Sequence, residues 1–196
     1  MPTPQRVARI REVMSRRQSG FIVVLEDIYD PHNAEAVIRS AEAFGVQDIY
    51  FIFNKETPFN PRAIGKKSSS SGNKWVTFKT FRTVKECVRE LRKKKYTLIG
   101  TTLQSTSKSL FKESFKEKNI ALWFGNESEG LSPEAIAALD RSIQIPMRGM
   151  VQSLNISVSA GICMFEITRQ RMRSRVSHLI SQKRANTLTK EYLRYE

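Results

Sequence analysis

Short runs rich in β-branched and aromatic residues recur along the chain, separated by segments with helical periodicity. The runs are Phe21–Leu25, Asp48–Phe53, Trp75–Phe78, Tyr96–Thr101, Ile120–Phe124 and Ser142–Ile145. Helical patterns occupy Asn33–Phe44, Thr83–Lys95, Pro133–Leu139 and Leu154–Arg173. Strands that alternate with helices predict an α/β domain with a mainly parallel sheet flanked by helices.

One helix start is marked by residue type. Ser132, Pro133 and Glu134 stand in the order of an N-cap, a first-turn proline and a first-turn acid. The serine side chain accepts a hydrogen bond from a free amide of the first turn, and proline has no amide that needs a partner. The negative charge of the glutamate complements the helix dipole. We therefore predict that a helix begins at Ser132.

The two ends of the chain carry helical patterns of their own. Apolar residues form one face near the N-terminus and begin another near the C-terminus: Val7, Ile10, Val13 and Met14, then Val176, Leu179 and Ile180. We predict a basic N-terminal helix at 1–20, a central domain at 21–167 and a basic helical extension at 168–196.

The chain is strongly basic, with 33 Lys and Arg against 19 Asp and Glu, for a net charge of +14. Residues 1–20 contribute +4 and residues 166–196 contribute +5, so the excess is concentrated at the ends. This charge favours a polyanionic partner, most simply nucleic acid. The alternatives are an ordinary basic surface, or terminal helices that serve as dimer or docking faces.

Several other classes of protein are not indicated. Cys87 and Cys163 lie in apolar helical patterns without metal-ligating neighbours, so we expect reduced core thiols and no metal site. No stretch has the length of a membrane span and the N-terminus lacks the apolar run of a signal peptide. A cytoplasmic protein is expected.

The run Ile145–Asn155 combines features of a ligand-binding turn. Pro146 ends a strand, and Ser153 and Asn155 place polar groups at the start of a helix whose free amides point outward. The apolar Leu154 stands between them. Such a turn suits a ligand with an aromatic ring and a polar tail.

Three segments in this order resemble the motifs of a known family. They are Asn33–Ala41, with Asn33 and Arg39 on one helix, then Phe124–Glu134 with Glu127, and then Ile145–Asn155. They resemble the SpoU, or TrmH, branch of the SPOUT RNA methyltransferases. The flanks of the motifs also resemble those of the family's tRNA enzymes, which methylate a guanosine of the D-loop.

The resemblance implies a fold and an activity. Family members thread the C-terminal part of their sheet into a deep trefoil knot, bind S-adenosylmethionine in its loops and form homodimers. The implied reaction is ribose 2′-O-methylation of tRNA, with the D-loop guanosine at position 18 as the target. The alternatives are the same reaction on rRNA or on another tRNA nucleotide, or an RNA-binding module of this fold without catalysis.

The resemblance also assigns residues to roles. The catalytic set is Asn33, Arg39, Glu127, Ser153 and Asn155. The cofactor set is Thr101, Gly125, Ile145, Ser153 and Leu154. The proposed RNA contacts are Arg9, Arg16, Lys66, Lys67, Asn73 and Lys74. A guanidinium stays protonated in proteins, so we expect Arg39 to orient the acceptor and to stabilise negative charge rather than to act as a base.

Structural interpretations compete with these roles. Arg39 is placed to pair with Glu35 or Glu42 on its own helix, and Asn33 is of a type that caps helices. A serine-rich stretch before Trp75, where the nearest family members are expected to be alanine-rich, weakens the assignment of the nucleotide. A nucleotide-binding dehydrogenase or a Rossmann methyltransferase is disfavoured because no G-x-G-x-x-G follows an early strand.

Overall fold

The computed structural model describes residues 2–64 and 72–194. Within these residues a seven-stranded sheet has the order β3-β2-β1-β6-β4-β7-β5, and every adjacent pair of strands is parallel. The strands are β1 (Phe21–Glu26), β2 (Asp48–Ile52), β3 (Thr77–Phe81), β4 (Thr97–Thr101), β5 (Lys108–Ser109), β6 (Ile120–Phe124) and β7 (Arg141–Gln144). The prediction of an α/β domain with a mainly parallel sheet is confirmed.

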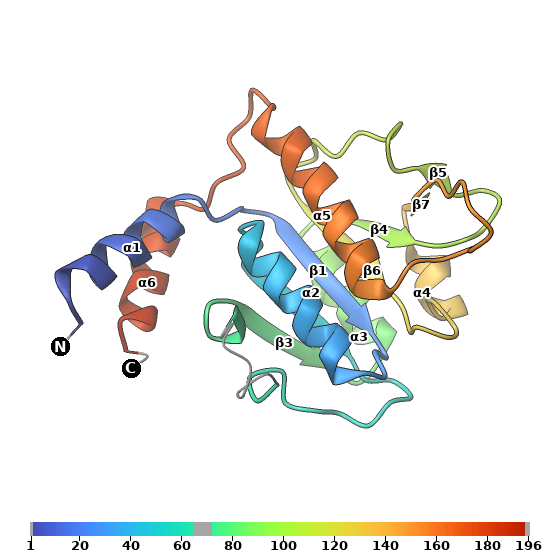
Figure 1. The fold of residues 1–196 in the computed structure, drawn as a ribbon, viewed down its shortest axis with the longest axis horizontal. Coiled ribbons are helices and arrows are strands. Elements are labelled where there is room, and N and C mark those ends of the chain that lie inside the picture. The colour runs from blue at the N-terminus through green and yellow to red at the C-terminus, as the bar shows by residue number, and fades with distance from the viewer. Residues whose placement is uncertain (1, 65–71, 195–196) are drawn as a thin grey trace.

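Helices cover both faces of the sheet (Figure 1). On one face α2 (Pro31–Ala43) packs against α5 (Ile156–Met172), and on the other lie α3 (Val84–Lys93) and α4 (Pro133–Ala138). A short 3-10 helix, η1 (Gly72–Lys74), precedes β3. Beyond one end of the sheet, α1 (Pro4–Ser15) and α6 (Gln182–Tyr192) pack on each other, so both ends of the chain lie in the same region.

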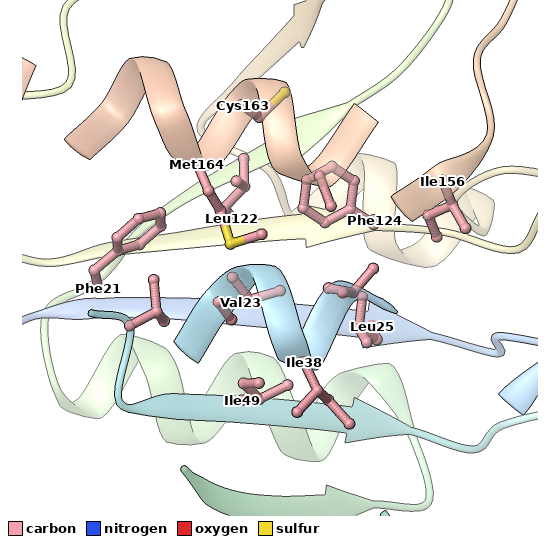
Figure 2. Close-up of a cluster of buried hydrophobic side chains, with 14 of the residues drawn as sticks. Phe21, Val23, Leu25, Ile38, Ile49, Leu122, Phe124, Ile156, Cys163 and Met164 are labelled. Atoms are coloured by element: carbon pink, nitrogen blue, oxygen red, sulfur yellow. The ribbon is translucent and has the colours of Figure 1, made fainter. Parts of the chain in front are cut away.

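Alternation along the central strands builds the two cores. In β1, Phe21, Val23 and Leu25 face α2 and α5, whereas Ile22 and Val24 face α3 and α4. The neighbouring β6 alternates in the same register, and Figure 2 shows its Leu122 and Phe124 among the side chains of the first core. Because β1 and β6 are buried on both faces, their sequences are almost continuously apolar.

A separate apolar cluster joins the two ends of the chain. Ile10 and Met14 of α1 pack with Leu188 and Tyr192 of α6, and Trp75 meets Tyr192 edge to face at 5.4 Å. The extensions are attached to the central domain through Arg17, which is 0% exposed. Its guanidinium donates hydrogen bonds to the carbonyl groups of Glu42, Val46 and Trp75 and forms an ion pair with Glu42.

A cavity of about 700 Å³ lies where the extensions meet α2 and α5, and we call it the terminal groove. Its lining includes the buried side chains of Arg17, Gln18, Arg171 and His178. Arg171 donates to the carbonyl groups of Ser19 and Lys118 and lies 3.0 Å from His178 Nδ1. These contacts hold the segments on both sides of the groove.

Two predicted elements differ most from the structure in their limits. The strand predicted at Trp75–Phe78 is β3 at Thr77–Phe81, because Trp75 closes the 3-10 turn and packs on α6 instead. The helix predicted to begin at Val176 begins at Gln182. Residues 176–181 are not helical, since Leu179 forms an isolated β-bridge with Gln18 and the amide of Ile180 donates to the carbonyl of Arg17.

Other sequence predictions are confirmed. Ser132 caps α4 by accepting a hydrogen bond from the amide of Ala135 at 3.1 Å. Cys87 and Cys163 are buried free thiols. Burial raises the pKa of Cys163 to about 12, so its thiol stays protonated and unreactive at neutral pH.

Candidate functional site

A cleft of about 640 Å³ opens at the carboxyl ends of β4, β6 and β7. We call it the strand-end cleft. All five residues predicted to bind a cofactor line it, as do three of the predicted catalytic residues: Thr101, Gly125, Glu127, Ile145, Ser153, Leu154 and Asn155. In open parallel sheets this edge is the usual place for ligands, because the loops after neighbouring strands converge there.

The loop after β6 is fixed by backbone geometry. Asn126 and Gly130 exchange two backbone hydrogen bonds of 2.9 Å, and Gly130 has a φ of +70°. A Cβ atom on Gly125 would collide with the carbonyl group of Gly130. The Asn126 side chain completes the turn by donating to the carbonyl of Asp27 and accepting from the amide of Ser128. This loop therefore presents Glu127 on a rigid support.

The loop after β7 ends at the N-terminus of α5. Asn155 is the N-cap, and its Oδ1 accepts from the amide and the hydroxyl of Ser157 at 2.8 and 2.6 Å. Leu154 is half-buried and Ser153 is exposed, and both line the cleft together with Ile145. Apolar surface and free hydroxyl and backbone groups therefore meet in this part of the cleft.

One hydrogen-bonded chain joins the three motifs. Asn155 Nδ2 donates to Asn33 Oδ1 at 3.0 Å, and Asn33 Nδ2 donates to Glu127 Oε1 at 2.9 Å. The other carboxylate oxygen of Glu127 accepts from the amide of Tyr29 at 3.2 Å. Residues far apart in the sequence thus meet beside the cleft, and the charged acceptor Glu127 sets the direction of the donors.

Asn33 does not cap its helix. The N-cap of α2 is Asp30, whose Oδ1 accepts from the amide of His32, and Pro31 follows as the first helical residue. The capping interpretation of Asn33 is therefore wrong, and the amide of its side chain is committed to Glu127 and Asn155.

Arg39 lies two turns further along α2, on an exposed part of the helix. It forms no ion pair within the described part of the chain, and the carboxylate of Glu42 pairs with Arg17 instead. Arg39 does not line the strand-end cleft of its own chain. The structure thus gathers Asn33, Glu127 and Asn155 but leaves the guanidinium outside this group.

The predicted RNA contacts have different environments. Asn73 donates to the carbonyl groups of Arg62 and Ile64, so its side-chain amide is already bound to the backbone of residues 62–64. Lys74 is exposed, whereas Lys66 and Lys67 lie outside the described residues. Arg9 and Arg16 are exposed, and each forms an ion pair of 2.8 Å with Glu12.

Sequence reasoning missed part of the cleft wall. Further residues that line it are Leu103, Gln104, Leu131, Ile136, Met147 and Gln152. Leu103 and Gln104 come two and three residues after Thr101, the last residue of β4, so the rule that ligands lie beyond strand ends points to them. Leu131, Met147 and Gln152 lie in loops and carry no periodic signal, and Ile136 comes from the short helix α4.

Two features are absent from the described residues, a metal site and a membrane-spanning helix. No group of three or more His, Cys, Asp or Glu side chains is placed to hold a metal ion there. Within the same residues no helix is long and apolar enough to cross a membrane.

Comparison with known proteins places this cleft in a family. The sequence profile of the SpoU rRNA Methylase family matches residues 20–165, which include all three motifs and the whole cleft. The chain belongs to the SpoU family. Its motifs are the segments that the hydrogen bonds of Asn33, Glu127 and Asn155 join.

Individual SpoU relatives cover most of the chain. The tRNA (guanosine(18)-2'-O)-methyltransferase of Thermus thermophilus is 37% identical over 88% of this chain and 86% of its own length. The crystal structure of the A. aeolicus TrmH/SpoU tRNA modifying enzyme aligns with a TM-score of 0.84 at 29% identity, covering 96% of this chain and 94% of that one. The 23S rRNA (guanosine-2'-O-)-methyltransferase RlmB of Coxiella burnetii is 31% identical over 80% of this chain and 61% of its own length.

Proposed function

We propose that the protein is an S-adenosylmethionine-dependent tRNA ribose 2′-O-methyltransferase whose target is the D-loop guanosine at position 18. The observation that carries the proposal is the chain of hydrogen bonds through Asn155, Asn33 and Glu127 at the border of the strand-end cleft. The names of the relatives that cover most of the chain support the choice of tRNA and of this guanosine.

The strand-end cleft fits the cofactor. Its volume of about 640 Å³ lies within the range of small-molecule sites, and its lining combines apolar side chains with loop backbone. Ile145 and Leu154 would hold the adenine ring, and Gly125 lets the loop after β6 close tightly, since any side chain there would collide with the carbonyl group of Gly130. S-adenosylmethionine supplies a methyl group that its sulfonium already makes electrophilic.

The protein residues must place the acceptor and help to remove its proton. Glu127, Asn33 and Asn155 fix the start of α2 against the cleft, so that the exposed Arg39 has a defined position on a rigid helix. We propose that Arg39 binds the phosphate next to the target ribose, orients the 2′-hydroxyl and stabilises the forming alkoxide, while the proton passes to phosphate or water. Arg39 as the direct base is the alternative.

We also propose a homodimer built on the outer face of α5. Val158, Phe165 and Met172 follow one another at seven-residue spacing and are 48%, 56% and 81% exposed. Such an apolar stripe is typical of a helix that packs on another copy. Because Arg39 does not line its own cleft, an assembly across this face would let it serve the partner's cleft.

The dimer and the origin of Arg39 can be tested together. Light scattering should give twice the chain mass for the wild type, and Phe165→Glu should shift it towards the monomer. In mixed dimers of Arg39→Ala and Gly125→Ala chains, activity should return to one site if Arg39 acts across the interface. Failure to recover activity would assign Arg39 to its own chain.

Three further proposals follow from the family. We infer a deep trefoil knot, supported by the connection from β7 to α5, which passes the ends of β4 and β6 before α5 packs beside α2. We place catalysis in residues 21–167, with basic helical extensions on either side.

We also propose that the enzyme is cytoplasmic and needs no metal. Full activity in excess chelator would test the proposal that no metal is needed.

The central test is to map the methylated nucleotide. Purified protein, labelled S-adenosylmethionine and a tRNA transcript should give one ribose-methylated guanosine at position 18, detected by nuclease digestion and mass spectrometry. A transcript with 2′-deoxyguanosine at that position should take up no label. Methylation of a base, or label in the deoxy control, would contradict the proposal.

The second candidate is a guanosine of 23S rRNA, which the resemblance to RlmB of Coxiella burnetii favours. The same assay on 23S rRNA fragments decides between the two. A kcat/KM that is higher for an rRNA fragment than for tRNA would reverse the choice of substrate and leave the reaction unchanged.

A further inference from the structure

The outer face of α3 carries three cations at four-residue spacing. Lys85, Arg89 and Lys93 are exposed and form no ion pair or hydrogen bond through their side chains within the described part of the chain. The spacing puts them about 6 Å apart along one face of the helix. We call these three residues the basic stripe of α3.

Neighbouring charges on the same helix are paired. Glu90 forms ion pairs with Lys79 and Lys94, at 2.8 and 2.7 Å. Arg92 is bound by Asp140 and also donates to the carbonyl of Ala138. These contacts explain the presence of Arg92 and Lys94 through the fold itself, whereas the fold gives no such explanation for the stripe.

The stripe opposes helix formation. Like charges four residues apart repel one another, and Arg89 has such a neighbour on each side. Lys85 stands in the first turn, where the helix dipole disfavours a cation, and the dipole favours only Lys93 in the last turn. A bound polyanion would offset this repulsion, so the arrangement suits recognition better than stability.

The charges at the chain ends are arranged differently. The carboxylate of Glu12 pairs with both Arg9 and Arg16, and Asp48 binds Arg184 of α6, so a negative charge lies next to each of these arginines. No carboxylate pairs with Lys85, Arg89 or Lys93 within the described part of the chain. The positive charges of the stripe therefore act together on a nearby polyanion.

The stripe also begins at the correct edge of the sheet. Thr83 caps α3 immediately after the carboxyl end of β3, and all the strands are parallel, so Lys85 lies at the edge where the strand-end cleft opens. From there the stripe leads down the opposite face of the sheet from α2. An RNA with one nucleotide at the cleft can continue along it.

We propose that Lys85, Arg89 and Lys93 form a docking surface for the phosphates of the RNA substrate, away from the reacting nucleotide. The inference rests on the proposed function in that the polyanion is RNA. An anionic membrane fits less well, because the apolar side of α3, with Val84, Cys87 and Leu91, is buried in the core.

The test compares two triple variants that remove equal charge. One is Lys85→Gln, Arg89→Gln, Lys93→Gln. The control is Lys112→Gln, Lys116→Gln, Lys118→Gln, which changes exposed lysines without ion pairs in the described residues. Dissociation constants for a tRNA transcript are measured by filter binding over a range of salt, without the methyl donor.

The stripe variant should bind tRNA at least about 10-fold more weakly, and its salt slope should fall by about two to three, near one per lost phosphate contact. The control should change affinity less than about twofold. Affinity for S-adenosylmethionine alone should not change in either variant. Equal losses in both variants, or an unchanged salt slope in the stripe variant, would overturn the proposal.

Further measurements distinguish a loss of RNA binding at the stripe from a folding defect and from failure of the proposed function. Removing the like charges should leave the melting temperature of the free protein equal or higher, and single variants should each lower the salt slope by about one if the triple variant is unstable. If the wild type methylates tRNA but the stripe variant binds tRNA normally, only the proposal of a docking surface is contradicted. If the stripe variant loses RNA binding but the wild type does not methylate tRNA, only the proposed function is contradicted. Absence of any tRNA binding overturns both.

Discussion

The strand-end cleft and the terminal groove are of similar size, about 640 and 700 Å³, but they use polar side chains in opposite ways. In the groove, Arg17 and Arg171 donate hydrogen bonds to backbone carbonyl groups of the same chain. In the cleft, Ser153 and the loop backbone keep hydrogen-bonding groups exposed beside apolar surface. Cavity size therefore does not identify the binding site. What distinguishes the two cavities is whether their polar groups are already hydrogen-bonded within the chain.

The comparison predicts that changes near the cleft affect chemistry and changes in the groove affect stability. Arg39→Ala should reduce methyl transfer by about 100- to 1000-fold, because it removes the charge that stabilises the alkoxide. S-adenosylmethionine affinity should stay within a few-fold, as measured by calorimetry, and the melting temperature should not change. Loss of donor binding in step with the rate would contradict the role given to Arg39.

In the groove, Arg171→Met should lower the free energy of unfolding by about 2 kcal/mol, because the partly buried carbonyl groups of Ser19 and Lys118 lose their donor. Urea denaturation measures this change, with the exposed Arg173→Met as the matched control. Activity at low temperature should persist. If Arg171→Met instead abolishes donor binding in a fully folded protein, the groove is a ligand site and the comparison breaks.

Gly125→Ala should weaken donor binding by about 10- to 100-fold, since overpacking by one methyl costs about 1–3 kcal/mol. The reason is the collision between the new Cβ and the carbonyl group of Gly130. The control is Gly161→Ala in α5, where an added Cβ meets nothing within 4 Å in the same chain. Because Gly161 lies between Val158 and Phe165 on the proposed dimer face, light scattering must show that this variant keeps the assembly of the wild type. Normal donor titrations for Gly125→Ala would show that the loop after β6 is less rigid than its hydrogen bonds indicate.

The smallest effect concerns pH. Burial, and then the neighbouring Arg171, lower the pKa of His178 below its usual range. Below about pH 6.5 the unfolded state therefore binds a proton that folded His178 resists, and stability falls as the pH falls. Between pH 7.5 and 5.5 the wild type should lose up to about 1 kcal/mol more than His178→Gln. Equal pH profiles for the wild type and His178→Gln would contradict the shift.

Much of the fold could be predicted because buried parallel strands have an unmistakable composition. The runs at Phe21–Leu25 and Ile120–Phe124 are apolar on both faces, and the structure makes them the central pair β1 and β6. The two-residue strand β5 was missed because so short a segment has no period. The start of α2 was misplaced although Asp30 and Pro31 carry an ordinary capping signal.

The site was only partly predictable. Motif resemblance found Asn33, Glu127 and Asn155, but no pattern in the sequence indicates that their side chains bind one another. Composition also suggested that the arginines at both ends face a polyanion. Arg17 and Arg171 are instead buried inside the chain, a use of charge that depends on tertiary contacts far apart in sequence.

The bridge between Gln18 and Leu179, together with the packing of α1 on α6, makes the two ends of the chain one cooperative unit. Deleting residues 1–18 would strip α6 of its apolar support, and deleting residues 176–196 would do the same to α1. Truncations of either end would thus report the same collapse, so point substitutions are the way to ask what each end contributes to RNA.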